Sequence, residues 1–397
     1  MTRHPFLFAA AALAALAAAG CAPGLEMPPV NEPLDSAAWA KCAGEAEQRE
    51  SVALIDAATL AEPRLVCRAA TLAAAGKTDE ALDLLTEAGV RDKKDHRPHY
   101  LAGRILAAAG RYEEALTAFQ KSAERYPQME VPTERLGREM MKKDGDAAAL
   151  SFVSKADERG LCPYGCRGLL AELHHRAGDD VKAKEVYEKM TAADPAEPQA
   201  FVGLAGLSNA AGDYAAESEL LTKATEAGHF EDLGPQARAD IYYSQAFARY
   251  NAHKTKGAAA SIERALELKA DHADWWVLAG WIQLRLEDPA IALVKFEKAA
   301  GLDAKLAAAQ TGRGDAELAL GRRADAIAAY EAAKALDPKS AVIVLKLAKA
   351  KALDRQLDAA RALFDEAVAL DKEHLPADLV KEVSALVNAQ AEGATAP

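Results

Sequence analysis

The stretch ADWWVLAGWIQLRLEDPAIALVKFEKAAGLDAKL, residues 273–306, decides the fold, because its pattern of small and aromatic residues returns every 34 residues. The recurring positions are Trp276, Gly280, Ala292, Phe296 and Ala299. Their counterparts are Gln310, Gly314, Ala326, Tyr330 and Ala333 in the next copy, and Val344, Ala348, Ala360, Phe364 and Ala367 in the third. A period of 34 predicts a helix-turn-helix array. The two helices of one copy cannot bury their apolar faces alone, so neighbouring copies must stack into a superhelix.

The same spacing extends over nine repeats, with one insertion of seven residues at 232–238. The repeats begin at Glu62, His96, Glu130, Tyr164, Pro198, Ala239, Ala273, Ala307 and Ala341. Their eighth position is always small, as is needed where two helices cross closely: Ala69, Gly103, Gly137, Ala171, Ala205, Ala246, Gly280, Gly314 and Ala348. The twentieth position is Ala in eight copies, and Glu217 is the exception. The twenty-fourth is apolar or aromatic in all nine, which predicts core residues: Leu85, Phe119, Val153, Tyr187, Leu221, Ile262, Phe296, Tyr330 and Phe364.

From residue 62 to about residue 374, this pattern resembles the tetratricopeptide repeat (TPR) family. The family's signature of small and aromatic residues is best matched in the repeat from His96, by Gly103, Tyr112, Ala115, Phe119 and Pro127. The closing proline recurs only at Pro195 and Pro338. The resemblance implies an all-α, right-handed α-solenoid that binds a protein or peptide partner in its concave groove.

The N-terminus predicts export. Polar and basic residues precede an apolar run of 14 residues, 6–19, which is shorter than the ~20 residues that a membrane-spanning helix needs and is typical of a secretory signal. The run ends in LAAAGC, and this sequence resembles the lipobox of bacterial lipoproteins, which implies lipid attachment at Cys21. Ala22 after the cysteine implies an outer-membrane lipoprotein facing the periplasm. The alternative is ordinary cleavage after Ala19.

The remaining segments follow from composition and register. We expect a signal peptide (1–20), a Pro-rich tether (21–35), an N-terminal helical unit (36–61), five repeats (62–231), the insertion (232–238), four repeats (239–374), a capping helix (375–390) and a disordered tail (391–397). Gly234 and Pro235 interrupt helical periodicity in the insertion, which predicts a hinge there. The alternative is a longer loop with stacking unchanged.

Composition and motifs exclude several functions. The chain carries a formal net charge of −12, and such a field opposes nucleic acid and anionic lipid. The sequence lacks a Gly-x-Ser-x-Gly elbow, a His-Glu-x-x-His pair and a phosphate-binding Gly-rich loop. We therefore expect no enzyme, no cofactor, no small-molecule substrate and no nucleic-acid partner.

Besides Cys21, the chain has an even number of cysteines, as is typical of an oxidising compartment. Proximity in the solenoid favours two disulfides, Cys42 with Cys67 and Cys162 with Cys166. Two histidines, His174 and His175, follow the second pair and open a zinc interpretation. The spacing matches no standard zinc finger, so we expect a disulfide and no metal.

The family resemblance also implies which residues line the groove, namely positions 2, 5, 9, 12 and 13 of each first helix. Spacings of three and four residues return to one helical face. In the two most aromatic adjacent repeats these positions include Tyr243, Phe247, Tyr250, Asn251, Trp281, Leu284 and Arg285. Nearer the N-terminus they give a basic lining: Arg104, Arg138, Lys142, His175 and Arg176. We predict that the aromatic residues grip an apolar segment of a partner and that the basic lining attracts its acidic flank. The alternative is that the aromatic residues only fill gaps between helices.

Two functions of different classes follow. The first is a membrane-anchored scaffold that binds a partner in the groove and assembles or localises a cell-envelope complex. The second is a structural or regulatory lipoprotein that dimerises, or activates a cell-wall enzyme, through its convex face. The position of aromatic side chains that do not pack in the core distinguishes the two functions. On first helices they would favour binding in the groove, and on second helices they would favour the convex face.

Overall fold

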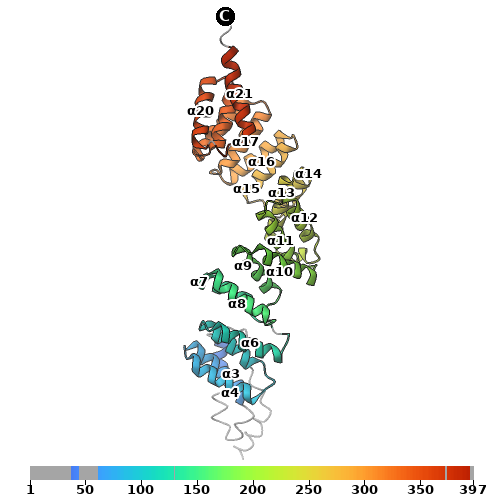
Figure 1. Ribbon diagram of the computed structural model, residues 1–397, viewed down its shortest axis with the longest axis vertical. Coiled ribbons are helices and arrows are strands. Elements are labelled where there is room, and N and C mark those ends of the chain that lie inside the picture. Colours follow the sequence, from blue (N-terminus) through green and yellow to red (C-terminus); the bar gives the residue numbers. More distant parts are fainter. Residues whose placement is uncertain (1–36, 44–60, 129, 372, 394–397) are drawn as a thin grey trace, which may run out of the picture. The chain divides into compact units, whose positions relative to one another are not determined.

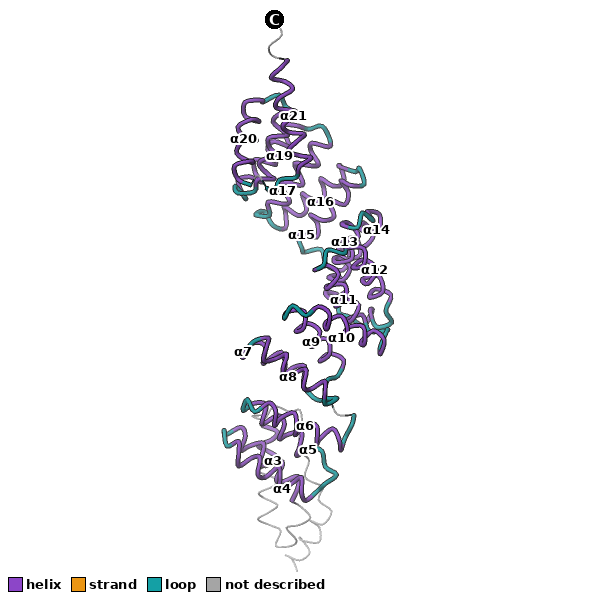
Figure 2. The backbone as a smooth tube through the Cα atoms, in the orientation of Figure 1, coloured by secondary structure: helices purple, strands orange, loops and turns teal. Residues whose placement is uncertain are grey.

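The computed structural model describes residues 37–43, 61–128, 130–371 and 373–393. Regular structure in these residues is entirely helical (Figure 2). The first helices of the repeats are α3 (Ala61–Ala74), α5 (Arg97–Ala108), α7 (Thr133–Asp144), α9 (Tyr164–Arg176), α11 (Pro198–Ala210), α13 (Pro235–Asn251), α15 (Ala273–Arg285), α17 (Ala307–Ala319) and α19 (Ala341–Leu353). The second helices are α4 (Thr78–Arg91), α6 (Tyr112–Arg125), α8 (Asp146–Glu158), α10 (Asp180–Ala193), α12 (Tyr214–Glu226), α14 (Thr255–Leu268), α16 (Pro289–Leu302), α18 (Arg323–Leu336) and α20 (Leu357–Leu370).

These helices form an α-solenoid of stacked pairs, as predicted, in two compact units (Figure 1). The first unit ends at Ala183 and the second begins at Lys184, inside α10. Most helices pack on their partner in the repeat, and most second helices also pack on the first helix of the next repeat, as α16 does on α17 and α18 on α19. Both contacts bury the apolar stripe of an amphipathic helix, which is what stabilises a short helix in water.

The small eighth residue of a repeat faces the large twenty-fourth residue of the same repeat. A Cβ added to Gly280 would lie 2.6 Å from the ring of Phe296, and one added to Gly314 would lie 2.5 Å from Tyr330. The ring of Phe296 also meets the next repeat, since a Cβ on Gly312 would lie 2.1 Å from it. The twenty-fourth residue is therefore a wedge between two first helices. It is buried in the first eight repeats and half-buried as Phe364 in the ninth.

The turn between the two helices of a repeat places one residue in the left-handed region of backbone conformation. The fifteenth residue has positive φ in eight repeats: Gly76, Gly110, Gly178, Gly212, His253, Glu287, Gly321 and Arg355. In the third repeat the neighbouring Gly145 has this conformation. Glycine adopts this conformation without steric cost, whereas His253, Glu287 and Arg355 adopt it at a cost in free energy.

The seven-residue insertion lies inside the second unit. It begins at the last residue of the 3-10 helix η1 (Phe230–Asp232) and supplies the first turn of α13, which is 17 residues long. Phe230 is buried, and its ring packs edge-on against Tyr242 at 5.3 Å. The hinge at 232–238 stays a prediction, and the division into compact units falls elsewhere, at Ala183.

A disulfide joins each cysteine pair that the sequence predicts. Cys42 and Cys67 have Cα atoms 5.7 Å apart, and Cys162 and Cys166 have Cα atoms 5.1 Å apart. The first bond joins the segment 37–43 to α3. Trp39, in the segment 37–43, is 1% exposed. Within the described part of the chain no cluster of His, Cys, Asp and Glu could hold a metal ion. The predicted signal peptide, Cys21, the tether and most of the N-terminal helical unit lie outside the described residues.

The C-terminal helix α21 (Ala377–Gly393) caps the last repeat through Val383 and Val387, both buried. It continues three residues into the segment 391–397, where we predicted a disordered tail. The physical reason is that residues 389–392, Ala-Gln-Ala-Glu, are mostly good helix formers. No helix in the described residues is long and apolar enough to cross a bilayer.

A candidate binding groove in the second unit

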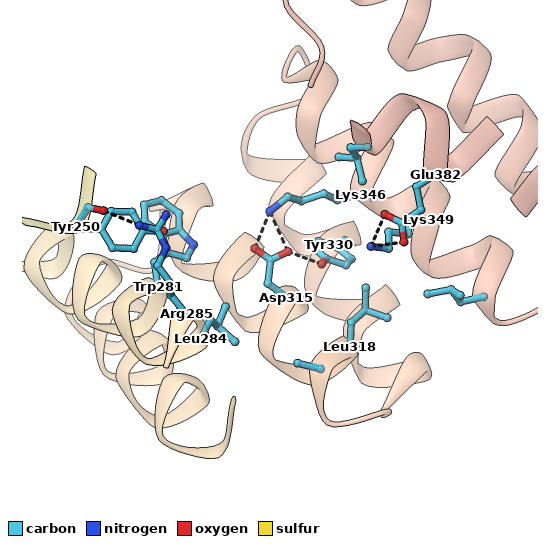
Figure 3. A pocket seen from close by; sticks show the side chains of 13 residues that line it. Tyr250, Trp281, Leu284, Arg285, Asp315, Leu318, Tyr330, Lys346, Lys349 and Glu382 are labelled. Carbon is cyan, nitrogen blue, oxygen red and sulfur yellow. Dashed lines mark hydrogen bonds and ion pairs between the residues drawn. The ribbon is translucent and has the colours of Figure 1, made fainter. Parts of the chain in front are cut away.

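A cavity of about 1000 Å³ opens along the first helices of the last three repeats. Residues at the ninth, twelfth and thirteenth positions of these repeats line it, which are the positions that the family resemblance implies. From α15 come Trp281, Leu284 and Arg285; from α17, Asp315, Leu318 and Ala319; from α19, Lys349 and Leu353. Lys346, Tyr330, Tyr250 and, from α21, Leu379 and Glu382 complete the lining (Figure 3). We call this cavity the groove.

Ion pairs between neighbouring helices fix the polar side of the groove. The Lys346 ammonium lies 2.6 Å from Asp315 Oδ2, and the Tyr330 hydroxyl donates to Asp315 Oδ1 at 2.6 Å (Figure 3). Burial, with the Asp315 charge beside it, raises the pKa of the Tyr330 hydroxyl, which therefore stays a donor. Lys349 and Glu382 pair at 2.8 Å. These contacts join α17 to α19 and α19 to α21, so they orient the lining before any partner binds.

The other end of the groove is aromatic. The Arg285 guanidinium lies over the Tyr250 ring, 3.6 Å from its centroid, and donates a hydrogen bond to the Tyr250 carbonyl. Trp281 is half-buried and meets the wedge Phe296 edge-on at 6.4 Å. The contact with the buried Phe296 restrains the indole, and Trp281 also lines the groove (Figure 3).

The predicted aromatic residues divide between two cavities. Tyr250, Trp281 and Arg285 line the groove, whereas Tyr243 and Phe247 line a smaller cavity of about 260 Å³ beside α11 and α12. Tyr243 stacks on the buried Trp275 at 5.2 Å, so it fills a gap between helices as well as lining a cavity. Phe247 is 37% exposed. Asn251 lines neither cavity, and its amide donates to the Phe247 carbonyl at 3.0 Å.

The predicted basic lining lies in the first unit, and carboxylates accompany most of it. Arg138 pairs with Glu134 and Glu172, His175 with Asp180 at 2.6 Å, and Arg176 with Asp146 at 2.7 Å. Lys142 is exposed. Pairing lowers the positive potential that these residues offer to a partner, so the electrostatic attraction expected from the sequence is weaker than the residue types indicate.

Sequence reasoning missed most of the groove, since it named only Tyr250, Trp281, Leu284 and Arg285 among the thirteen lining residues. The ninth-position rule, applied to the last two repeats, points directly to Asp315 and Lys349. Lys346 lies at the sixth position and could not be found this way, because it lines the groove through its contact with Asp315 in the preceding repeat. Glu382 belongs to α21, outside the repeat register.

Comparison with known proteins agrees with the helix-pair architecture. Tetratricopeptide repeat models match residues 72–131 and, in overlapping copies, residues 243–307, 283–341 and 311–374. No curated protein matches the chain.

Among solved structures, the chain is similar to YrrB, described as a TPR protein with an unusual peptide-binding site, at 19% identity over 51% of this chain and 98% of YrrB, with a TM-score of 0.39. It is similar to pilF of Pseudomonas aeruginosa at 17% identity over 56% of this chain and 96% of that chain, with a TM-score of 0.44. The C-terminal part of a TPR repeat-containing protein from Cytophaga hutchinsonii gives 15% identity over 63% of this chain and 98% of that one, with a TM-score of 0.49.

The 34-residue register and the stacked helix pairs define an α-solenoid, and its second unit presents a groove. With family matches over residues 72–131 and 243–374, the chain is a tetratricopeptide repeat protein. Proteins of this family are scaffolds for protein interaction.

Proposed function

We propose that this protein binds an apolar segment of a partner protein in the groove of the second unit, and so assembles or localises a complex of the cell envelope. One observation carries the proposal: apolar side chains from four helices, α15, α17, α19 and α21, line one open cavity beside fixed ion pairs. These side chains are Trp281, Leu284, Leu318, Leu353 and Leu379. An exposed apolar strip with a polar rim is typical of interaction sites.

The charges of the groove also favour a particular partner. The groove is lined by three cationic side chains, Arg285, Lys346 and Lys349, and by two carboxylates, Asp315 and Glu382, which leaves one positive charge in excess. Arg285 lies at the aromatic end, where arginine and tryptophan commonly contribute most of the binding energy at interfaces. An apolar segment with an acidic residue beside it complements this surface.

The envelope location is supported by the chain's export features. The apolar run at 6–19 is typical of a secretory signal, and the lipobox-like sequence ending at Cys21 supports an anchor in the outer membrane. Two cysteine pairs at disulfide geometry fit an oxidising compartment. A lipid on Cys21 followed by a Pro-rich spacer would hold the array at the membrane surface while leaving the groove accessible.

A second candidate function rests on the second helices. Ile291 and Val294 of α16 are 44% and 61% exposed, and the two residues lie on the same side of that helix. They offer a small apolar surface for dimerisation or for activation of another protein. Exposed aromatic residues favour the first helices instead. Phe247 lies on a first helix, whereas the exposed Tyr126, next to a second helix, stacks on His96 at 4.8 Å.

Capture of partners by detergent-solubilised, full-length protein tests the proposal. The Trp281→Ala variant removes the main aromatic surface of the groove, and Val294→Ala is the matched control on α16. We expect Trp281→Ala to lower the captured partner at least ~10-fold, because aromatic hot-spot residues contribute ~2 kcal/mol or more. The control should capture the partner as the unmodified protein does. Equal capture by Trp281→Ala, with helical content unchanged, would overturn the groove proposal.

A further inference from the structure

Glu217 departs from the repeat pattern, and the structure gives this departure a chemical meaning. Its position, the twentieth of the repeat, is alanine in each of the other eight copies. It lies in the first turn of α12 and is only 4% exposed. A buried carboxylate costs far more free energy than a buried methyl group unless it is paired, so packing alone does not account for it.

The carboxylate of Glu217 is only partly satisfied. The Asn209 amide of α11 donates to its Oε2 at 2.9 Å, and this is its sole hydrogen bond to another side chain in the described residues. Burial raises the pKa of Glu217, and the hydrogen bond from Asn209 offsets this only in part. The other oxygen, Oε1, remains available to a donor from outside the chain.

This carboxylate belongs to the lining of the smaller cavity, about 260 Å³ in volume. Val202, Ala205, Gly206 and Leu221 give the cavity apolar walls, and Tyr243, Ser244 and Phe247 of α13 close its other side. A Cβ built on Gly206 would meet nothing within 4 Å, so the wall on that side is open. A water molecule occupies ~30 Å³ in the liquid, so the cavity has room for a long side chain.

We propose that this cavity binds the side chain of a lysine in the partner segment, with its ammonium on Glu217. The inference rests on the proposed function, since it takes the first helices of the second unit to be the surface that receives a partner. Charge complementarity selects a cation, and the apolar walls accommodate the four-carbon stem of lysine. The partly exposed ring of Phe247 offers a face to the cation.

The geometry favours lysine over arginine. A guanidinium binds a carboxylate best through two parallel hydrogen bonds to its two oxygens, and Asn209 already occupies one of these oxygens. An ammonium is a compact charge with three donors. One donor can reach Glu217 Oε1, and the Asn209 carbonyl oxygen and the Ser244 hydroxyl are further acceptors in the same cavity.

The test uses a random peptide library displayed on phage and selected against the full-length protein in detergent. We expect lysine to be enriched at one position of the selected peptides, and the enrichment to disappear in selections against Glu217→Gln and Glu217→Ala. The alanine variant restores the residue of the other eight repeats, so it should fold, and the glutamine variant keeps the shape while removing the charge.

Calorimetry on the best peptide and its lysine→norleucine counterpart then measures the charge effect directly. The replacement should weaken binding at least ~10-fold on the unmodified protein and less than about 2-fold on Glu217→Gln, because a desolvated charge pair is lost only in the first case. Selections that yield no binder, binders without lysine, or an equal effect on both proteins would overturn the proposal. Trp281→Ala separates the two proposals. If it weakens the peptide while lysine has no effect, the groove function stands and the lysine site is wrong. If neither Trp281→Ala nor Glu217→Gln alters binding, both are wrong.

Discussion

Replacing the wedge residue Phe296 with alanine tests how the repeats hold one another. Phe296 is fully buried and contacts α15 at Gly280 and α17 at Gly312. Phe→Ala changes in a protein core destabilise by ~3–5 kcal/mol, because a cavity is added to the loss of burial. Since each ~1.4 kcal/mol corresponds to a factor of ten, local opening of the helices around residue 296 should become roughly 10²- to 10⁴-fold more frequent.

Amide hydrogen exchange followed by mass spectrometry measures this opening helix by helix. Because each repeat contacts only its neighbours, exchange should accelerate in α15, α16 and α17 and stay unchanged in α3 to α6 of the first unit. Val294→Ala on the same helix is the control. Its side chain is 61% exposed, so its effect should stay within ~0.5 kcal/mol. Unchanged exchange in α15–α17, or equal acceleration in the first unit, would refute nearest-neighbour stacking around this wedge.

Three further results follow from the structure. Glu287→Gly should stabilise the protein by ~1 kcal/mol and Gly321→Ala should destabilise it by ~1 kcal/mol, both in urea titrations, because the two residues occupy the left-handed turn position; opposite signs would contradict this account of the turn. Burial, followed by the charge of Arg125, lowers the pKa of His99 to about 4. As the pH drops from about 6.5 to about 4, the unfolded chain therefore binds a proton before the folded chain does, and the free energy of unfolding should fall by at most ~3 kcal/mol. A His99→Gln variant with the same pH profile would contradict this. Cys21→Ser should move the exported protein from the detergent phase to the aqueous phase, and unmodified protein found wholly in the aqueous phase would refute the lipid anchor.

The repeat architecture could be predicted because the sizes of certain residues recur at fixed positions in every repeat. A wedge such as Phe296 needs a small residue opposite it, so a small eighth position and a large twenty-fourth position recur together and show the register. The left-handed turn was missed for a physical reason. Glycine is the usual residue there, but His253, Glu287 and Arg355 tolerate the conformation at a cost, and this obscures the pattern in the sequence.

The candidate sites were only partly predictable. Positions on one helical face follow from periodicity, and Tyr250, Trp281 and Arg285 were found in this way. Contacts between repeats do not follow from it. The pairing of Lys346 with Asp315 depends on how adjacent helices are offset, which one sequence does not reveal. Glu217 was visible as an exception, but its burial and its place in a cavity required the structure.

Site-specific photocrosslinking in intact cells tests the central claim most directly. A photoreactive amino acid at Ala319, an exposed groove position, is compared with one at Val294, an exposed position on a second helix. We predict that Ala319 forms a discrete crosslink to an envelope protein, that Trp281→Ala abolishes this crosslink, and that Val294 forms none. A crosslink from Val294 with none from Ala319 would contradict the groove and favour the second helices as the interaction surface.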